Sequence, residues 1–253
     1  MTSPASPQPP RSHTLRVAAS PADVAVLAAA ELLALLETAI AWRGEAHLCL
    51  SGGSTPRLLH QALVATPFSG WPHVHVWFGD ERSVPRSHPD SNVGMAHLTL
   101  IDLVPIAPDH VHVLDGGMEP HAAAASYHDE LQALAVRSGK GVPVMDALVL
   151  GMGDDGHTAS VFPGSPLLRA DAPSAQWCAA VHVPALDTWR LSMTPGVLQA
   201  AAAVAVLVAG AGKHAALTRV LRADASVDVL PVRLLEQARG DVVWFVDVPA
   251  LFG

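Results

Sequence analysis

The sequence predicts an α/β fold in which a mainly parallel central sheet is flanked by helices on both faces. Short apolar runs with strand character alternate with helical patterns through the first 160 residues, an alternation typical of a parallel sheet. Glycine-rich turns follow several of these runs. The chain has 253 residues, of which 50% are hydrophobic, and this is enough for a sizeable core. Beyond residue 176 the pattern is less regular and predicts a small mixed sub-lobe.

The composition argues against a nucleic-acid or membrane partner. Only 15 residues are Lys or Arg and the formal net charge is −8, whereas a nucleic-acid-binding surface is normally basic. The most apolar window, residues 200–211, is too short to span a bilayer. The two cysteines, Cys49 and Cys178, form no metal-ligand spacing and no disulfide framework. We therefore expect buried thiols in a reducing, cytoplasmic compartment.

The N-terminal segment, residues 1–13, is rich in Pro, Ser and Gln and lacks the apolar core of a secretory signal. We expect it to be a disordered leader. No internal repeat or linker divides the rest of the chain, so residues 14–253 are expected to form one domain. The sequence leaves monomer and dimer open.

The first 150 residues contain four predicted helices and four predicted strands. Ser20 is a suitable N-cap and Pro21 is tolerated at the first helical position, so a helix is expected from there to Gly44. The residues Asp90-Ser91-Asn92 are expected to cap another helix. The predicted helices cover residues 21–43, 57–64, 92–103 and 119–137, and the predicted strands cover residues 46–50, 74–78, 110–114 and 144–150.

The rest of the chain has strands and helices in less regular order. A loop is expected over residues 221–230, and Pro231 is expected to open a short helix. The predicted strands cover residues 177–183, 189–193, 203–209 and 241–248, and the other predicted helices cover residues 195–200 and 214–222.

A loop of small residues follows the predicted strand 46–50. A strand, a small-residue loop and a helix form an arrangement that binds phosphate, because glycines allow close approach, hydroxyls donate and free N–H groups at the helix start face the anion. No lysine is present, so the loop is not a Walker A site. An ordinary strand-to-helix turn with a Ser or Thr cap is the alternative. The loop consists of Ser51, Gly52, Gly53, Ser54 and Thr55, followed by Pro56.

Three charged residues, Asp80, Glu81 and Arg82, stand at the end of the predicted strand 74–78. Arg82 is suited to a forked contact with a phosphate or a carboxylate. The two acids either orient this arginine or are solvated. Two further cations lie later in the chain. Arg190 is at the start of the predicted strand 189–193, and Lys213 is at the glycine turn after the predicted strand 203–209. Taken singly, each of these two is more often a solvated surface charge.

A second glycine-rich turn, residues 151–163, has the sequence GMGDDGHTASVFP and follows a predicted buried strand. In an open parallel sheet, ligands bind beyond the carboxyl ends of the strands. Histidine is the side chain whose unperturbed pKa lies nearest neutral pH, so His157 is the natural proton carrier of such a site. A nearby carboxylate such as Asp155 fixes its tautomer. The alternative is a surface turn with a solvated histidine.

These motifs together resemble 6-phosphogluconolactonases, with SGGSTP at 51–56, GDER at 79–82, SN at 91–92, the turn 151–163, RLSMT at 190–194 and Lys213. The resemblance extends from about residue 22 to residue 247. It implies a fold shared with glucosamine-6-phosphate deaminase and ribose-5-phosphate isomerase. It also implies hydrolysis of 6-phospho-D-glucono-1,5-lactone to 6-phospho-D-gluconate, the second step of the oxidative pentose phosphate pathway. No metal or other cofactor is implied.

The resemblance also implies roles for individual residues. His157 matches the proton carrier that assists the attack of water on the lactone carbonyl, and Asp80 and Asp155 match acidic positions beside the reaction centre. The loop from Ser51 to Thr55 matches the phosphate-binding loop. The cations of the cleft correspond to Arg82, Arg190 and Lys213. Val161 stands where the family often has Leu.

Two rival functions remain: an amino-sugar phosphate deaminase or isomerase on the same fold, and a non-catalytic sugar-phosphate sensor from another functional class. An amino-sugar phosphate deaminase resembling this chain carries Glu five residues after the motif histidine, where this chain has Phe162, and Asp-Glu-Tyr where this chain has Asp80-Glu81-Arg82. Both differences favour the lactonase. A non-catalytic sugar-phosphate sensor would keep the loop but not need His157.

Overall fold

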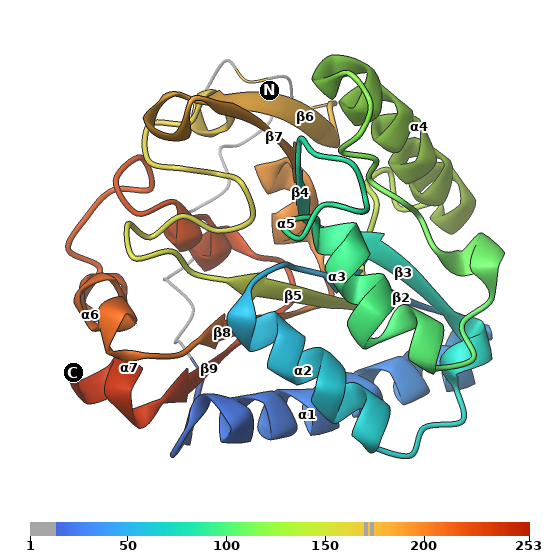
Figure 1. The fold of residues 1–253 in the computed structure, drawn as a ribbon, viewed down its shortest axis with the longest axis horizontal. Coiled ribbons are helices and arrows are strands. Elements are labelled where there is room, and N and C mark those ends of the chain that lie inside the picture. Colours follow the sequence, from blue (N-terminus) through green and yellow to red (C-terminus); the bar gives the residue numbers. More distant parts are fainter. Residues whose placement is uncertain (1–13, 170–171, 173–174) are drawn as a thin grey trace, which may run out of the picture.

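A six-stranded parallel sheet forms the centre of the computed structural model (Figure 1). The structure describes residues 14–253 except 170–171 and 173–174, so the predicted leader, residues 1–13, lies outside it. The strand order is β1-β9-β8-β5-β2-β3, and every neighbouring pair is parallel. These strands are β1 (Thr14–Ala18), β2 (Ala46–Leu50), β3 (Val74–Phe78), β5 (Ala147–Gly151), β8 (Ala203–Val208) and β9 (Asp241–Asp247). The predicted α/β fold with a mainly parallel sheet is confirmed.

A second sheet of three antiparallel strands forms the predicted sub-lobe, in the order β4-β7-β6. Its strands are β4 (Asp80–Arg82), β6 (Cys178–Val183) and β7 (Thr188–Met193). It packs on the parallel sheet, since the Cys49 thiol of β2 lies 3.9 Å from the Met193 sulfur of β7. Because β4 follows β3 after Gly79 alone, the three charged residues of β4 lie where the two sheets meet.

Helices cover both sheets (Figure 1). Helix α1 (Pro21–Arg43) begins at its Ser20 cap, ends at left-handed Gly44, and packs with α2 (Ser54–Ala65) on one face of the parallel sheet. Helix α4 (Pro120–Ser138) packs on the small sheet, and its Tyr127 hydroxyl accepts from the Phe78 amide at 2.7 Å. The others are α3 (Asn92–Thr99), α5 (Pro195–Ala200), α6 (His214–Arg222) and α7 (Val248–Phe252).

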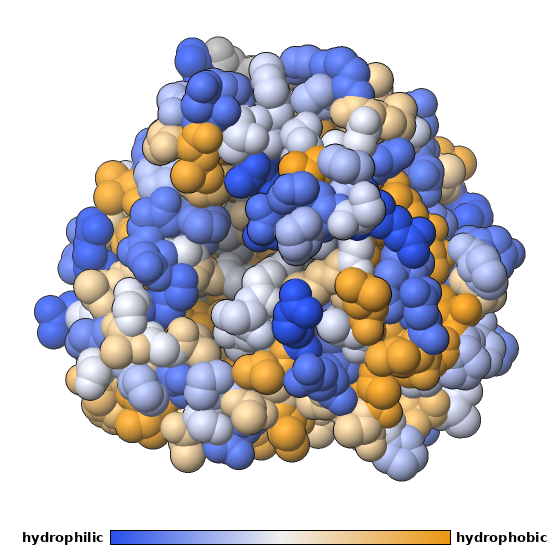
Figure 2. All heavy atoms as spheres, viewed as in Figure 1, coloured by the Kyte–Doolittle hydropathy of each residue, from blue (hydrophilic) through white to orange (hydrophobic). Residues whose placement is uncertain are grey.

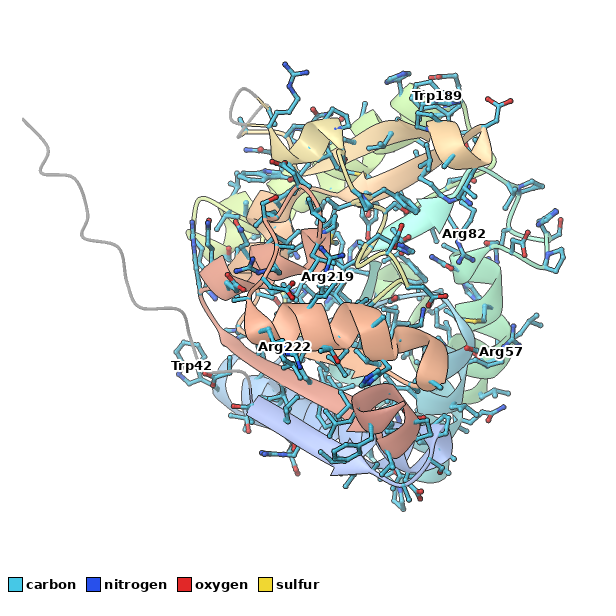
Figure 3. The ribbon with its side chains drawn as sticks, turned by 90° about the vertical axis from the view of Figure 1, so that its left-hand side faces the viewer. Trp42, Arg57, Arg82, Trp189, Arg219 and Arg222 are labelled. Carbon is cyan, nitrogen blue, oxygen red and sulfur yellow. The ribbon has the colours of Figure 1, made fainter. Side chains whose placement is uncertain are left out.

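Helix α1 is long and apolar enough to cross a membrane by length and composition alone, with a mean hydropathy of 2.0 over its most apolar window. This differs from the expectation that residues 200–211 are the most apolar part of the chain, which took no account of helix α1. In the structure one face of α1 is buried against the sheet, and its core residues include Leu32 and Leu36. The opposite face is exposed, and Trp42 projects from the last turn (Figure 3).

Several predicted boundaries were wrong. Residues 110–114 form no strand, because only Val111 bridges to β3 before the chain turns toward Gly116. Helix α3 ends at Thr99 and a short 3-10 turn, Ile101–Leu103, replaces its predicted last turn. The strand β1, the strand β4 and the helix α7 were not predicted. Local sequence pattern does not mark them, because β1 is mostly exposed and partly polar, β4 consists of three charged residues and α7 has only five residues.

Four histidines form a stack at the amino ends of β2 and β3. The predicted site lies at the opposite, carboxyl ends of the parallel strands. His75 stacks on His110 with ring centroids 3.9 Å apart, and its Nδ1 lies 3.1 Å from Nε2 of His112. His47 lies next to His75, with centroids 5.0 Å apart. The carboxylates that face the stack are those of Glu45, Glu130 and Asp146, and Arg137 adds a positive charge. We name these four residues the histidine stack.

The histidine stack is expected to make the fold acid-sensitive. Burial, then repulsion from His110, His47 and His112, lowers the pKa of His75 from 6.5 to about 4. In acid the unfolded chain therefore binds a proton that the folded chain rejects, so stability is full above pH 6.5 and falls as the pH drops toward 4. The loss from this residue is on the order of 3 kcal/mol at pH 4.

This prediction is tested by urea unfolding of wild type and His75→Gln between pH 4 and 7.5. The variant should lose less free energy of unfolding than wild type over this range. His73→Gln, which changes an exposed histidine two residues away, should follow wild type. Equal pH dependence of wild type and His75→Gln would show that His75 does not carry the effect.

Candidate active site

A cavity of about 210 Å³ opens at the carboxyl ends of the parallel strands. Figure 2 shows a hollow on this face, bordered by hydrophilic side chains near the start of α2. Nine predicted site residues line the cavity: Ser51, Gly52, Gly53, Ser54, Thr55, Asp80, Arg82, His157 and Lys213. The remaining lining residues include Met152, Ala159 and Leu207. The structure therefore brings together motifs that are up to 162 residues apart in the sequence, from Ser51 to Lys213.

The first loop presents the start of α2 to the cavity. Gly53 is the N-cap residue, with φ of 113°, and provides no side-chain cap. The amide of Arg57 donates to the Gly53 carbonyl at 3.1 Å and makes the first turn of the helix. The amides of Ser54 and Thr55 precede this bond and have no intrahelical partner. The uncapped helix start is therefore suited to an anion, as the sequence predicted.

Strand β4 sends its side chains alternately to two sides. Asp80 and Arg82 line the cavity, and Arg82 extends from β4 toward the α2 side of the molecule, where Arg57 also lies (Figure 3). Nη1 of Arg82 donates to the Asp90 carbonyl at 2.5 Å. Glu81 points the other way and is 1% exposed. Its predicted alternatives, orienting Arg82 by its side chain or being solvated, are both replaced by a structural role.

Glu81 holds the start of helix α3. Its carboxylate accepts from the Ser91 hydroxyl and from the amides of Arg82, Asn92 and Val93, at 2.7–2.8 Å. Burial raises its pKa, and these four donors oppose that rise. Of the three residues predicted to cap this helix, Ser91 is the N-cap, because its hydroxyl accepts from the Gly94 amide at 3.0 Å. One buried carboxylate thus fixes the geometry between β4 and α3.

His157 lies in the second glycine-rich turn and is held by Asp155. Nδ1 of His157 donates to Oδ1 of Asp155 at 2.7 Å, and the His157 amide donates to the same oxygen at 3.0 Å. The hydrogen bond to the imidazole lowers the pKa of Asp155, so the acid is a carboxylate. This assigns the proton of neutral His157 to Nδ1 and leaves Nε2 as the basic nitrogen. Asp155 is not among the residues that line the cavity, but it is hydrogen-bonded to the lining residue His157.

The turn is closed by its own backbone. Gly153 donates to the His157 carbonyl at 2.8 Å, and Gly156 donates to the Gly153 carbonyl at 3.0 Å. The Thr158 amide faces the Val161 carbonyl at 3.4 Å. A Cβ atom on Gly153 would lie 2.0 Å from Nδ1 of His157, so only glycine fits there. The amides of Gly153, Gly156, His157, Thr158 and Val161 are therefore already hydrogen-bonded within the turn.

Phe162 stacks on His157, with ring centroids 4.3 Å apart and an interplanar angle of 26°. This is the position at which the deaminases resembling this chain carry a glutamate. The aromatic ring restricts the imidazole and offers no proton-transfer group. Asp155 and Phe162 together therefore hold His157 from two directions.

The two later cations differ in position. Lys213 lines the cavity, and its Nζ pairs with Oδ1 of Asp154 at 2.6 Å, a partner that no sequence motif indicates. Arg190 does not line the cavity, although it lies directly opposite Arg82 in the β4–β7 pair. Its Nη1 donates to the Trp189 carbonyl at 3.1 Å, and the nearby Arg82 charge adds to burial in lowering its pKa.

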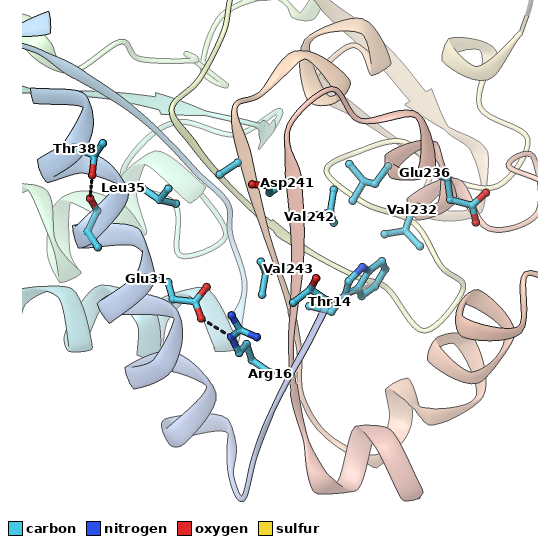
Figure 4. A pocket seen from close by; sticks show the side chains of 14 residues that line it. Thr14, Arg16, Glu31, Leu35, Thr38, Val232, Glu236, Asp241, Val242 and Val243 are labelled. Carbon is cyan, nitrogen blue, oxygen red and sulfur yellow. Dashed lines mark hydrogen bonds and ion pairs between the residues drawn. The ribbon is translucent and has the colours of Figure 1, made fainter. Parts of the chain in front are cut away.

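A larger cavity of about 680 Å³ lies at the amino ends of the parallel strands, opposite the smaller cavity (Figure 4). Thr14, Ala203 and Asp241, the first residues of three parallel strands, contribute to its lining. It contains the ion pair between Arg16 and Glu31, 2.6 Å apart, and none of the predicted site residues. The larger cavity lacks the predicted site residues, whereas nine of them line the smaller cavity, so the smaller cavity is the candidate active site. Within the described ranges, no group of three or more His, Cys, Asp or Glu is arranged to hold a metal ion.

A family model and curated relatives agree on the family of this chain. The family model of glucosamine-6-phosphate isomerases/6-phosphogluconolactonase matches residues 19–244. The chain is 36% identical to a 6-phosphogluconolactonase of Synechocystis sp. over 214 residues, which cover 84% of this chain and 86% of that one. It is 32% identical to a 6-phosphogluconolactonase of Haemophilus influenzae over 208 residues, covering 81% and 86% of the two chains.

Solved structures agree. The 6-phosphogluconolactonase of Trypanosoma brucei superposes with a TM-score of 0.81 at 26% identity, covering 94% of this chain and 97% of that one. A monomeric glucosamine-6-phosphate deaminase superposes with a TM-score of 0.76 at 16% identity, covering 94% and 98%. The second likeness concerns the fold alone, and it confirms the fold relationship to the deaminases that the sequence motifs implied.

Proposed function

The chain belongs to the glucosamine-6-phosphate isomerase/6-phosphogluconolactonase family, and from this premise we propose that it hydrolyses 6-phospho-D-glucono-1,5-lactone to 6-phospho-D-gluconate. It is a lactonase, a hydrolase that serves the oxidative pentose phosphate pathway. The observation that supports the proposed mechanism is the His157–Asp155 pair, which faces a cavity shared with an uncapped helix start.

The 6-phosphate of the lactone is proposed to bind at the first loop. The unpaired amides at the start of α2 and the hydroxyls of Ser51, Ser54 and Thr55 supply donors, and Arg82 and Lys213 supply positive charge. With a net charge of −8, the chain has no general positive field to attract an anion. Recognition therefore depends on these few placed groups.

His157 is proposed to act first as a base and then as an acid. Its free Nε2 takes a proton from a water molecule while the water oxygen attacks C1 of the lactone. The tetrahedral intermediate then breaks its bond from C1 to the ring oxygen, and the imidazolium donates its proton to that oxygen. Asp155 stabilises the imidazolium through Nδ1.

The oxyanion of the intermediate needs hydrogen-bond donors or positive charge near C1 of the lactone. The amides of Gly153, Gly156 and His157 already donate within the turn. Among the described lining residues, the cationic side chains are Arg82 and Lys213, besides His157 itself. We propose that the positive charges of Arg82 and Lys213 stabilise the negative charge that develops on the oxyanion.

Phe162 favours the lactonase over the deaminase. A deaminase must open a sugar ring and move a proton between carbons, which needs an additional proton-transfer group. The ring that stacks on His157 has none. Lactone hydrolysis needs a single proton carrier, and the described cavity offers His157 for that role.

The proposed function is tested with freshly prepared 6-phosphogluconolactone and coupled oxidation of the product, after subtraction of the uncatalysed rate. Hydrolysis well above the uncatalysed rate is expected, with no ammonia from glucosamine 6-phosphate. Ammonia release would favour the deaminase. Binding of sugar phosphates without turnover would favour the sensor. A cytoplasmic location and the absence of nucleic-acid, membrane and cofactor requirements stay predictions of the sequence.

A further inference from the structure

Asp80 is the carboxylate of the cavity whose role the sequence left unassigned, and the structure holds it firmly. It is 8% exposed and lines the cavity. Its Oδ2 accepts from the hydroxyl of Ser160 at 2.7 Å, and its Oδ1 accepts from Nδ2 of Asn92 at 3.2 Å. Nδ2 of Asn92 also donates to the Asp80 backbone carbonyl at 2.9 Å. Donors from two distant segments therefore converge on one side chain.

Both of these donors are themselves buried and fixed. Ser160 is 2% exposed. Its backbone is held in place because its amide donates to Oγ of Ser192 at 3.3 Å. Asn92 is 2% exposed, and its amide donates to the Glu81 carboxylate at 2.7 Å. Neither side chain lines the cavity. They have no direct access to a substrate there and act on it only through Asp80.

Asn92 also touches the phosphate-binding loop. A Cβ atom on Gly52 would lie 1.6 Å from Oδ1 of Asn92, so the amide group occupies the space above this glycine. Oδ1 is buried and has no hydrogen-bond partner among the described residues. The orientation of the amide is nevertheless fixed, because both groups that its other end contacts are acceptors. One side chain thus sets the distance between the loop and Asp80.

We propose that Asn92 and Ser160 are positioning residues that aim the Asp80 carboxylate at a hydroxyl group of the bound sugar, at a fixed distance from the phosphate loop. A carboxylate has about four lone-pair sites, so the Ser160 and Asn92 bonds leave room for a substrate hydroxyl. The inference rests on the proposed function, because it takes the lactone as the ligand. It adds to that function a device that selects sugar phosphates by the spacing of phosphate and hydroxyl.

The test is a double-mutant cycle. Asn92→Ala and Ser160→Ala are made in the wild-type chain and in Asp80→Asn, and kcat and KM for the lactone are measured. Each single change should lower kcat/KM by about 10- to 100-fold, the range for hydrogen bonds to a charged group. In the Asp80→Asn background the same changes should add less than about 3-fold, because the group they aim is already altered.

Ser165→Ala is the matched control, because it removes another buried serine hydroxyl from the following turn, where Oγ accepts from the Leu167 amide. It should leave kcat/KM within about 3-fold of wild type. Equal losses in both backgrounds would overturn the inference, since a general structural defect is additive with Asp80→Asn. If Asn92→Ala does not fold, the Ser160 cycle decides alone. An inactive wild type would instead remove the proposed function, and the inference with it.

Discussion

Replacing His157 by alanine should lower kcat/KM for 6-phosphogluconolactone by about 10²- to 10⁴-fold, the usual cost of losing a general acid–base group. The chain should still fold, because the side chain is partly exposed and its partner Asp155 stays at the surface. The measurement is the coupled lactone assay, with unfolding curves of both proteins recorded in the same buffer.

The chain offers a matched control for this change. His182 is another partly exposed histidine, 3.4 Å from the carboxylate of Asp187, but it lies outside the cavity. His182→Ala should keep wild-type activity. Asp155→Asn should fall between the two, because it leaves the imidazole in place with a weakened tautomer preference. Full activity in His157→Ala would move the proton carrier elsewhere, with Asp80 as the next candidate.

Replacing Glu81 by alanine should have the largest effect on stability. The change removes the acceptor of four hydrogen bonds, and three of the donors are backbone amides at the start of α3 and in β4. A buried donor left without a partner costs about 1–3 kcal/mol. The expected loss is on the order of 4 kcal/mol or more, a large part of the usual total of about 5–15 kcal/mol.

Urea unfolding at pH 7 measures this loss. Glu37→Ala removes an exposed acid from helix α1 and should change the free energy of unfolding by less than about 0.5 kcal/mol. Glu81→Gln should also be strongly destabilised, because its NH₂ group meets amide donors where the carboxylate accepts. A loss below about 1 kcal/mol in Glu81→Ala would mean that water replaces the missing acceptor.

The fold class could be predicted because local signals carried it. Five of the six parallel strands are short, mostly apolar runs, and helix α1 has a clear cap at Ser20. Strand β4 has no such signal, since Asp-Glu-Arg is a poor strand by composition. It exists because Arg82 and its two neighbours pair with β7, more than a hundred residues later in the chain.

The site could be predicted only in part, for a similar reason. Residues whose chemistry is visible in the motif, such as His157 and the loop from Ser51 to Thr55, meet at one cavity. Contacts that join distant segments left no local trace. Ser160 reaches Asp80 across 80 positions, and Asn92 reaches Gly52 through space. The sequence offered Asp154 as one of two adjacent acids, without a sign that it pairs with Lys213.

The position of the histidine stack separates two responses to acid. His47 and His75 lie at the amino ends of their strands, whereas His157 follows the carboxyl end of another strand in the same sheet. Protonation at one end is expected to weaken the scaffold, and under the proposed mechanism protonation at the other end removes the base. A pH–activity curve of this protein is therefore a product of two titrations, one reversible within the folded enzyme and one that depletes it.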